Sequence, residues 1–218
     1  MKSFDNAEIL FCDNHVLIAA KPSGMLTQPD DTERNSLEVF AKNWLKKEYQ
    51  KKGNVFLHCI HRLDIGVSGL VLFARTSKAL SRLNEQMRQM DIQRIYHAEV
   101  EGSLSKTKEG QLDHYLIHGD HRALVVKEGD VGAKHARLHF QVIQSFPQST
   151  LVQVELETGR YHQIRAQFSA IGHPIIGDKR YGSQIGAEGE IRLHCSKISF
   201  QHPVTKELVT FESPAPFA

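Results

Sequence analysis

The chain has 218 residues, 40% of them apolar, and carries a formal net charge of +2 at pH 7. This length supports a single large domain or two intimately joined lobes, and we expect residues 1–218 to form one domain. So small a net charge does not by itself indicate a nucleic-acid-binding protein. There is no N-terminal apolar segment of the secretory type and no run of about 18 apolar residues, so the sequence predicts neither secretion nor a membrane span.

The cysteines add a second constraint. Cys12, Cys59 and Cys195 are odd in number and widely spaced. This usage is typical of free thiols in a reducing cytoplasm, because disulfide frameworks use paired cysteines. We therefore expect a cytoplasmic protein.

The first predicted elements are a hairpin and a helix. The apolar runs at residues 9–12 and 16–20 are separated by Asp13-Asn14, which is typical of a β-hairpin. A helix is predicted over residues 37–45, because apolar residues recur there at helical spacing. Asn35 together with Glu38 is expected to cap the start of this helix, and Trp44 is expected to face the core.

The middle and C-terminal parts alternate between strands and helices. Residues 70–74 are uniformly apolar, which indicates a buried strand, and Ser77 is expected to cap the helix that follows. Residues 103–134 are polar and glycine-punctuated, and we interpret them as an irregular insertion or hairpin rather than a second domain. Strands of alternating apolar and polar residues are predicted near residues 96–100, 136–142 and 152–156. A last helix is predicted over residues 161–171, with Gly172 as its C-terminal stop.

One motif concentrates chemistry. In the stretch from His61 to Leu70, Asp64 follows Arg62 at a separation of two residues, and a Ser-Gly pair leads into the apolar strand. A carboxylate at the mouth of a buried strand needs a cation or several donors to hold it. Asp64 is therefore either part of a structural ion pair or a positioned, ionised catalytic group.

A second cluster lies about a hundred residues further on. Thr158-Gly159-Arg160-Tyr161-His162-Gln163-Ile164-Arg165 is followed by Gly172-His173-Pro174-Ile175-Ile176-Gly177-Asp178. With the motif around Asp64, these segments resemble, in order, the signatures of the RluA-type pseudouridine synthases. Smaller family signals are also present, including Lys21-Pro22-Ser23-Gly24, and the resemblance extends from about Ile9 to Pro216.

This resemblance implies an α+β fold with a central mixed, largely antiparallel sheet, flanking helices and an open active-site cleft. It implies a stand-alone catalytic domain without an S4 module, which isomerises uridine in RNA to pseudouridine without a cofactor. Asp64 matches the family's essential aspartate, Arg165 the arginine that pairs with it, and Tyr96 the tyrosine that packs against the target base. Such a partner should hold the pKa of Asp64 at or below about 3.9.

Other residues are expected to contact RNA. Arg62 resembles the family arginine that enters the stack vacated by a flipped-out base. Arg160 and His162 lie where contact to phosphate or to the aspartate is expected, while His61 either contacts RNA or orients the loop. Asp178 is expected to brace the turn near Tyr181. The run Lys46, Lys47, Lys51 and Lys52 is interpreted first as a solvated helix end and second as an RNA contact.

Two departures from the family pattern concern the substrate region. Arg94 replaces the usual lysine two residues before Tyr96, and residues 113–116 read Asp-His-Tyr-Leu where relatives often have Pro-Leu. A guanidinium keeps the charge of a lysine but changes its geometry. These departures affect the predicted substrate contacts and leave the catalytic core intact.

Alternatives remain open at this point. Zinc binding by His58, Cys59 and His61 with His194-Cys195 is disfavoured by the spacing, so no metal is expected. A two-carboxylate glycosidase needs a partner for Asp64, and neither signature supplies one beside it. An RNA-binding protein of the same fold with reduced or no catalytic turnover is the remaining alternative. The expected partner is structured RNA, either ribosomal or transfer RNA, and we expect a monomer with no obligate protein partner and no membrane association.

Overall fold

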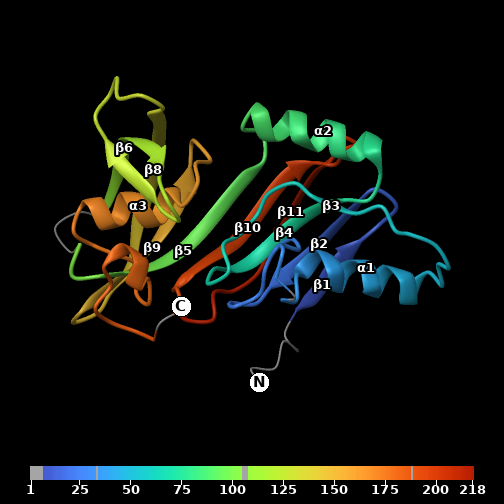
Figure 1. Ribbon diagram of the computed structural model, residues 1–218, viewed down its shortest axis with the longest axis horizontal. Helices are drawn as coiled ribbons and strands as arrows, with labels where there is room; N and C mark the ends of the chain where they lie inside the picture. Colours follow the sequence, from blue (N-terminus) through green and yellow to red (C-terminus); the bar gives the residue numbers. More distant parts are fainter. Residues whose placement is uncertain (1–6, 33, 105–107, 188) are drawn as a thin grey trace. The chain divides into compact units, whose positions relative to one another are not determined.

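The computed structural model describes residues 7–32, 34–104, 108–187 and 189–218, and the chain divides into two compact units (Figure 1). Unit 1 comprises the residues up to 93 together with 195–213, and unit 2 comprises 94–194 together with 214–218. Both units are antiparallel sheets with helices packed on them, so the predicted α+β fold is confirmed. Residues 105–107 of the predicted insertion lie outside the described residues.

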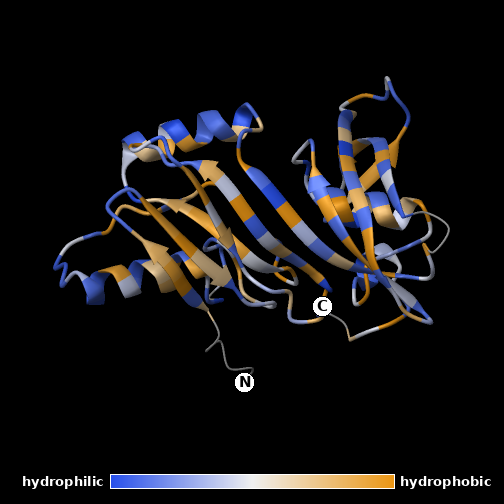
Figure 2. Ribbon diagram, turned by 180° about the vertical axis from the view of Figure 1, so that it is seen from behind, coloured by the Kyte–Doolittle hydropathy of each residue, from blue (hydrophilic) through white to orange (hydrophobic). Residues whose placement is uncertain are grey.

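Unit 1 is built on the strand order β1-β2-β4-β10, with β3 paired to β4 and β11 paired to β10. The predicted hairpin is confirmed, and the Asp13 carboxylate closes its turn by accepting the backbone N–H of His15 and of Val16, both at 2.7 Å. All residues of β4 are buried, and the central strands of this unit are mostly hydrophobic in Figure 2. The bounds are β1 Glu8–Cys12, β2 Val16–Lys21, β3 His58–Cys59, β4 Ser68–Ala74, β10 Leu193–Gln201 and β11 Leu208–Glu212.

Two helices belong to unit 1: α1 (Leu37–Glu48), which contacts β2, and α2 (Ser77–Arg88), which contacts β4. Both predicted starts are wrong by one residue. Ser36 caps α1 and Thr76 caps α2, each hydroxyl accepting the backbone N–H three residues later. At each helix start, two neighbouring residues have side chains suited to capping. Ser36 and Thr76 are the caps because their backbones are extended, as an N-cap requires.

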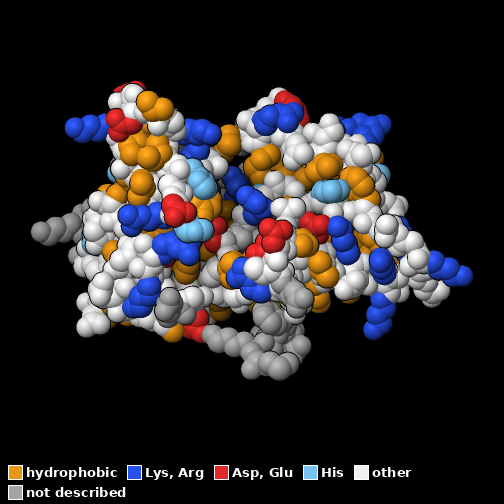
Figure 3. Space-filling model, viewed as in Figure 1, with side chains coloured by type: hydrophobic (Ala, Val, Ile, Leu, Met, Phe, Trp, Pro, Cys, Tyr) orange, Lys and Arg blue, Asp and Glu red, His pale blue; other side chains and the backbone are white. Residues whose placement is uncertain are grey.

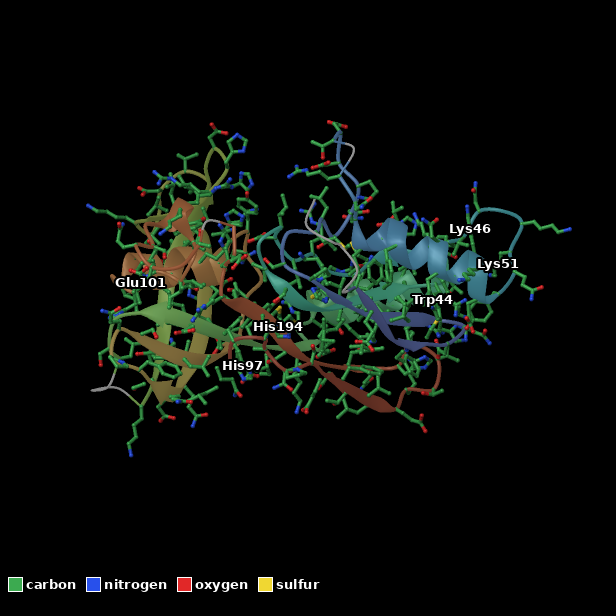
Figure 4. The ribbon with its side chains drawn as sticks, turned by 90° about the horizontal axis from the view of Figure 1, so that it is seen from below. Trp44, Lys46, Lys51, His97, Glu101 and His194 are labelled. Atoms are coloured by element: carbon green, nitrogen blue, oxygen red, sulfur yellow. The ribbon has the colours of Figure 1, made fainter. Side chains whose placement is uncertain are left out.

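The C-terminal end of α1 carries the lysine run. Lys46 and Lys51 are exposed, and Figure 4 shows both side chains at the end of the helix. Trp44 is half-buried and packs edge-on to the Tyr49 ring at 6.5 Å between centroids. The core position expected for Trp44 is therefore only partly reached, since the buried residues of α1 are Leu37, Glu38, Ala41 and Leu45.

Unit 2 is built on the strand order β5-β9-β8-β6-β7. The strands are β5 (Gln93–Glu101), β6 (Glu109–His118), β7 (Ala123–Val126), β8 (Lys134–Ser145) and β9 (Ser149–Leu156). The three alternating strands predicted from the sequence are β5, β8 and β9. The predicted insertion contains the hairpin β6–β7, which joins the sheet through β8.

One helix, α3 (Gln163–Ala170), packs on β6 and β7. It begins two residues later than predicted, because His162 has a left-handed backbone with φ of 51°. Gly172 ends it as expected: with φ of +81°, its N–H bonds Ser169 O, and the His173 N–H bonds Phe168 O, both at 3.0 Å. These two bonds form a Schellman motif, which requires a left-handed residue where the glycine stands.

Candidate active site

Asp64 lies in unit 1 on the loop that joins β3 to β4. Leu63, the residue before it, has both of its backbone polar groups bound by the Thr27 hydroxyl. That hydroxyl donates to Leu63 O at 2.7 Å and accepts the Leu63 N–H at 3.0 Å. The residues after it turn back, with the Val67 N–H bonded to Asp64 O at 3.0 Å. Asp64 as a residue is half-buried. The backbone that carries the carboxylate is therefore fixed before and after the residue.

A second segment of unit 1 fixes the far side of this loop. The Lys21 ammonium donates to Ile65 O at 3.2 Å and to Met25 O at 2.7 Å. The Gly24 N–H donates to the same Ile65 carbonyl at 2.7 Å, and the Ser23 hydroxyl donates to Gly66 O at 2.9 Å. The segment Lys21-Pro22-Ser23-Gly24, noted from the sequence only as a family signal, thus binds the loop directly after Asp64.

Lys21 is the functional candidate that the sequence reasoning missed. It ends the buried strand β2 and is only 2% exposed. Burial lowers its pKa to about 7, and the Asp64 carboxylate opposes that change. A lysine that closes a buried apolar strand is uncommon, since lysine is rarely buried without a partner. That signal could have identified the residue.

The Ser-Gly pair that ends the motif has a packing cause. Gly69 has φ of +117°, and a Cβ placed on it would lie 2.4 Å from the backbone N and O of Cys195. No side chain fits at that separation, so β4 can pass this close to β10 only at a glycine. The motif therefore combines a fixed loop at Asp64 with a close strand contact at Gly69.

The remaining two site residues of unit 1, His61 and Arg62, precede Asp64 in the chain. Arg62 is exposed, so its guanidinium is available to solvent. His61 is buried, and its Nε2 accepts the Leu72 N–H at 3.3 Å. This bond supports the loop-orienting role given as one of the two alternatives for His61.

In unit 2, α3 positions Arg165. Its guanidinium forms a two-pronged ion pair with Asp178, with Nε–Oδ2 at 2.6 Å and Nη2–Oδ1 at 2.9 Å. The two side chains are only 5% and 1% exposed, and the guanidinium lies 5.0 Å above the Tyr181 ring. The Asp178 carbonyl also accepts the Tyr181 N–H at 3.0 Å, so the bracing role predicted for Asp178 has a geometric basis. The pairing of Arg165 with Asp64 stays a prediction, because the two residues belong to different units.

The loop before α3 is organised by Gln163. Its Oε1 accepts the Thr158 hydroxyl at 2.8 Å and the Arg160 N–H at 2.9 Å, while its Nε2 donates to Arg137 O at 3.0 Å. These bonds give the Thr158 and Gln163 side chains a structural role in this loop, whereas Arg160 takes part through its backbone N–H. Gly159 lies against Arg94, whose Nη2 would be 3.2 Å from an added Cβ.

Arg160 and His162 occupy different environments. Arg160 is exposed, and its Nε donates to His135 O at 2.8 Å, which fixes the plane of the guanidinium. His162 is buried, and its Nδ1 lies 3.0 Å from the Tyr181 hydroxyl. Arg160, His162 and Arg165 are thus brought together at the start of α3. Arg160 is placed for a solvent-side contact, whereas the Nδ1 edge of His162 faces the interior of unit 2.

Tyr96 lies in β5, paired in register with Val154 of β9, and is 5% exposed. This burial is compatible with both of its predicted roles, packing against a base or filling the core. The catalytic role of Tyr96 and the open cleft stay predictions.

Two features are absent from the described part of the chain. No helix there is long and apolar enough to cross a membrane. Within the same ranges, no group of three or more His, Cys, Asp or Glu side chains is arranged to hold a metal ion.

Comparison with known proteins gives consistent results. The family described as RNA pseudouridylate synthase matches residues 15–170. The chain is 36% identical over 216 residues to the uncharacterized RNA pseudouridine synthase YhcT of Bacillus subtilis, covering 98% of this chain and 70% of that protein. It is 31% identical over 217 residues to the dual-specificity RNA pseudouridine synthase RluA of Vibrio parahaemolyticus, covering 96% and 84%.

A solved structure supports the fold independently. Human RNA Pseudouridylate Synthase Domain Containing 4 superposes with a TM-score of 0.79, covering 95% of this chain and 88% of that one, at 20% identity. At this identity the likeness concerns the fold alone.

Proposed function

We propose, from the premise that this chain belongs to the RNA pseudouridine synthase family, that Asp64 is the essential carboxylate of its active site. The family match and the relatives identify an isomerase that converts uridine in RNA to pseudouridine. The observation that supports Asp64 is its setting. Asp64 is a half-buried residue on a loop held by Thr27 before it and by Lys21 after it.

The reaction explains why such a setting is needed. The bond between uracil N1 and ribose C1′ breaks, the base turns, and a bond forms between C5 and C1′, while C5 loses a proton and N1 gains one. No redox change and no net hydrolysis occurs, so the reaction requires no cofactor. An ionised carboxylate at fixed position can attack the sugar, attack the ring or remove a ribose proton. We leave these three roles open for Asp64.

Arg165 and Tyr96 complete the proposed catalytic set. Asp178 binds the Nε and Nη2 atoms of Arg165. A second carboxylate would therefore bind Arg165 through Nη1. In this arrangement Asp178 orients the guanidinium and Arg165 stabilises the anionic form of Asp64. Tyr96 would pack against the target base, where aromatic stacking contributes about 1–3 kcal/mol per base.

We also propose that both units form a single catalytic domain acting on structured RNA, ribosomal or transfer. The target uridine must leave its stack, at a cost of a few kcal/mol. We assign Arg62, which is exposed, the role of entering the vacated space. Arg160 would contact phosphate, and His61 and His162 would hold the two RNA-facing loops. The protein would act as a cytoplasmic monomer without an obligate protein partner.

A tritium-release assay tests this function. RNA carrying tritium at uracil C5 should lose it to solvent in the presence of the protein, with pseudouridine as the quantitative product. Free uracil would instead support the glycosidase alternative, and RNA binding without tritium release would support the non-catalytic one. Pseudouridine mapping in total RNA from cells with and without this chain would then identify the target.

A further inference from the structure

In unit 2, the rings of His118, Tyr161 and His162 form a stack that extends from the interior to the solvent. The Tyr161 and His162 rings stack at 3.8 Å between centroids with 19° between their planes. The His118 ring lies 4.2 Å from Tyr161 at 33°. We propose that this ring stack (His118, Tyr161 and His162) is a binding site for an unpaired nucleobase of the RNA substrate, separate from the target uridine; the inference rests on the proposed function.

The order of the rings follows from the distances. One face of a ring has room for only one other ring at about 4 Å, so His118 and His162 must lie on opposite faces of Tyr161. His162 is buried, Tyr161 is 37% exposed and His118 is exposed. The outer ring of the stack, His118, is therefore the one that can receive a further ring from solvent.

The backbone at His162 makes the stack possible. Side chains of consecutive residues normally diverge, but φ of 51° and ψ of 25° at His162 reverse the chain and place its ring parallel to that of Tyr161. The left-handed conformation is costly for a residue other than glycine and is found preferentially at functional sites. The Tyr181 hydroxyl, 3.0 Å from His162 Nδ1 and 2.7 Å from the Ala123 N, fixes the inner ring against β7.

Core packing does not account for the outer half of this arrangement. A structural stack gains stability by removing its rings from water, yet two of the three rings here remain partly in water. Stacked aromatic rings at the surface are what proteins use to hold single-stranded bases, because every base presents an aromatic face.

The charges around the stack fit a nucleic acid. Arg160 precedes Tyr161 in the chain, and Arg122 and Arg180 lie at the turn that follows His118, where Arg180 donates to His121 O at 2.7 Å. All three arginines are exposed. On the face of this unit that Figure 3 shows, Lys or Arg and His side chains lie interspersed with Asp and Glu side chains. A base on His118 would thus have phosphate-binding cations beside it.

The test uses the whole protein and a pyrimidine oligoribonucleotide that carries one central 2-aminopurine. The oligonucleotide has about 12 nucleotides, a length within the site sizes of single-strand-binding proteins. Stacking on His118 should quench the 2-aminopurine fluorescence in the wild type and in Asp64→Asn alike. His118→Ala should abolish the quenching and weaken binding about fivefold to 100-fold. His118→Phe should restore both, because phenylalanine retains the ring without the imidazole nitrogens.

Two controls separate stacking from charge and from folding. His121→Asn changes a histidine on the same turn that lies outside the stack, and its affinity should equal that of the wild type. The slope of log affinity against log salt should be the same for His118→Ala as for the wild type, because stacking releases no counterions. Binding by His118→Ala within twofold of the wild type, or failure of His118→Phe to recover, overturns the inference.

Failure of this inference is distinguishable from failure of the proposed function. A normal tritium-release rate at limiting RNA in His118→Ala would refute the ring stack and leave the isomerase intact. Quenching by the wild type without any tritium release would support the stacking site while refuting the catalytic assignment.

Discussion

Replacing Asp178 by asparagine tests how Arg165 is held. The pair has two short contacts, 2.6 and 2.9 Å, between side chains that are 5% and 1% exposed. Removing one partner of such a buried pair leaves an uncompensated charge and costs about 3–5 kcal/mol. For a chain of this length, each kcal/mol lowers the midpoint of thermal unfolding by about 2–4 °C. Asp178→Asn should therefore lower the midpoint by about 6–20 °C.

The measurement is thermal unfolding followed by far-ultraviolet circular dichroism. Glu212→Gln is the matched control, because it removes an ion pair of similar length, Lys197–Glu212 at 2.9 Å, whose side chains are 39% and 67% exposed. Exposed pairs contribute about 0–1 kcal/mol. A midpoint for Asp178→Asn no lower than that for Glu212→Gln would refute the reasoning.

Two further predictions concern the loop of Asp64. Burial lowers the pKa of Lys21 to about 7, whereas an unfolded lysine titrates near about 10.4. Between these two pKa values the unfolded chain binds more protons at Lys21 than the folded chain does. The unfolding free energy of the wild type, measured relative to that of Lys21→Met, should therefore rise with pH by up to about 1.4 kcal/mol per pH unit. A pH-independent difference between the two in urea denaturation would contradict this. Gly69→Ala should cost at least about 1–3 kcal/mol, since its Cβ would lie 2.4 Å from the Cys195 backbone, whereas Gly53→Ala, with no heavy atom within 4 Å, should stay within about 0.5 kcal/mol. Equal stabilities for the two alanine variants would contradict the close-contact argument.

Local patterns in the sequence predicted most of the fold. Apolar runs located β2 and β4, alternation located β5, β8 and β9, and Gly172 located the end of α3. Where the sequence offered two equivalent local choices, the prediction was off by one residue: Asn35 and Ser36 are both good caps, as are Thr76 and Ser77. The late start of α3 could not be predicted, because nothing about a histidine at position 162 indicates a left-handed backbone.

The candidate site was predictable to the extent that motifs carry it. The motif located Asp64, but the groups that hold its loop are distant in sequence, since Thr27 lies 36 residues before Leu63. The Arg165–Asp178 ion pair joins the two segments of the second cluster, and the pattern of neither segment indicates that pairing. Such contacts depend on how the chain closes on itself, which single-sequence patterns do not encode.

The most direct test of the central claim compares Asp64→Asn with the wild type in tritium release from uracil C5 and in RNA affinity. Asparagine keeps the shape of the side chain but cannot become an anion. We predict that Asp64→Asn binds RNA with nearly the affinity of the wild type and releases no tritium above background. Tritium release at the wild-type rate by Asp64→Asn would contradict it.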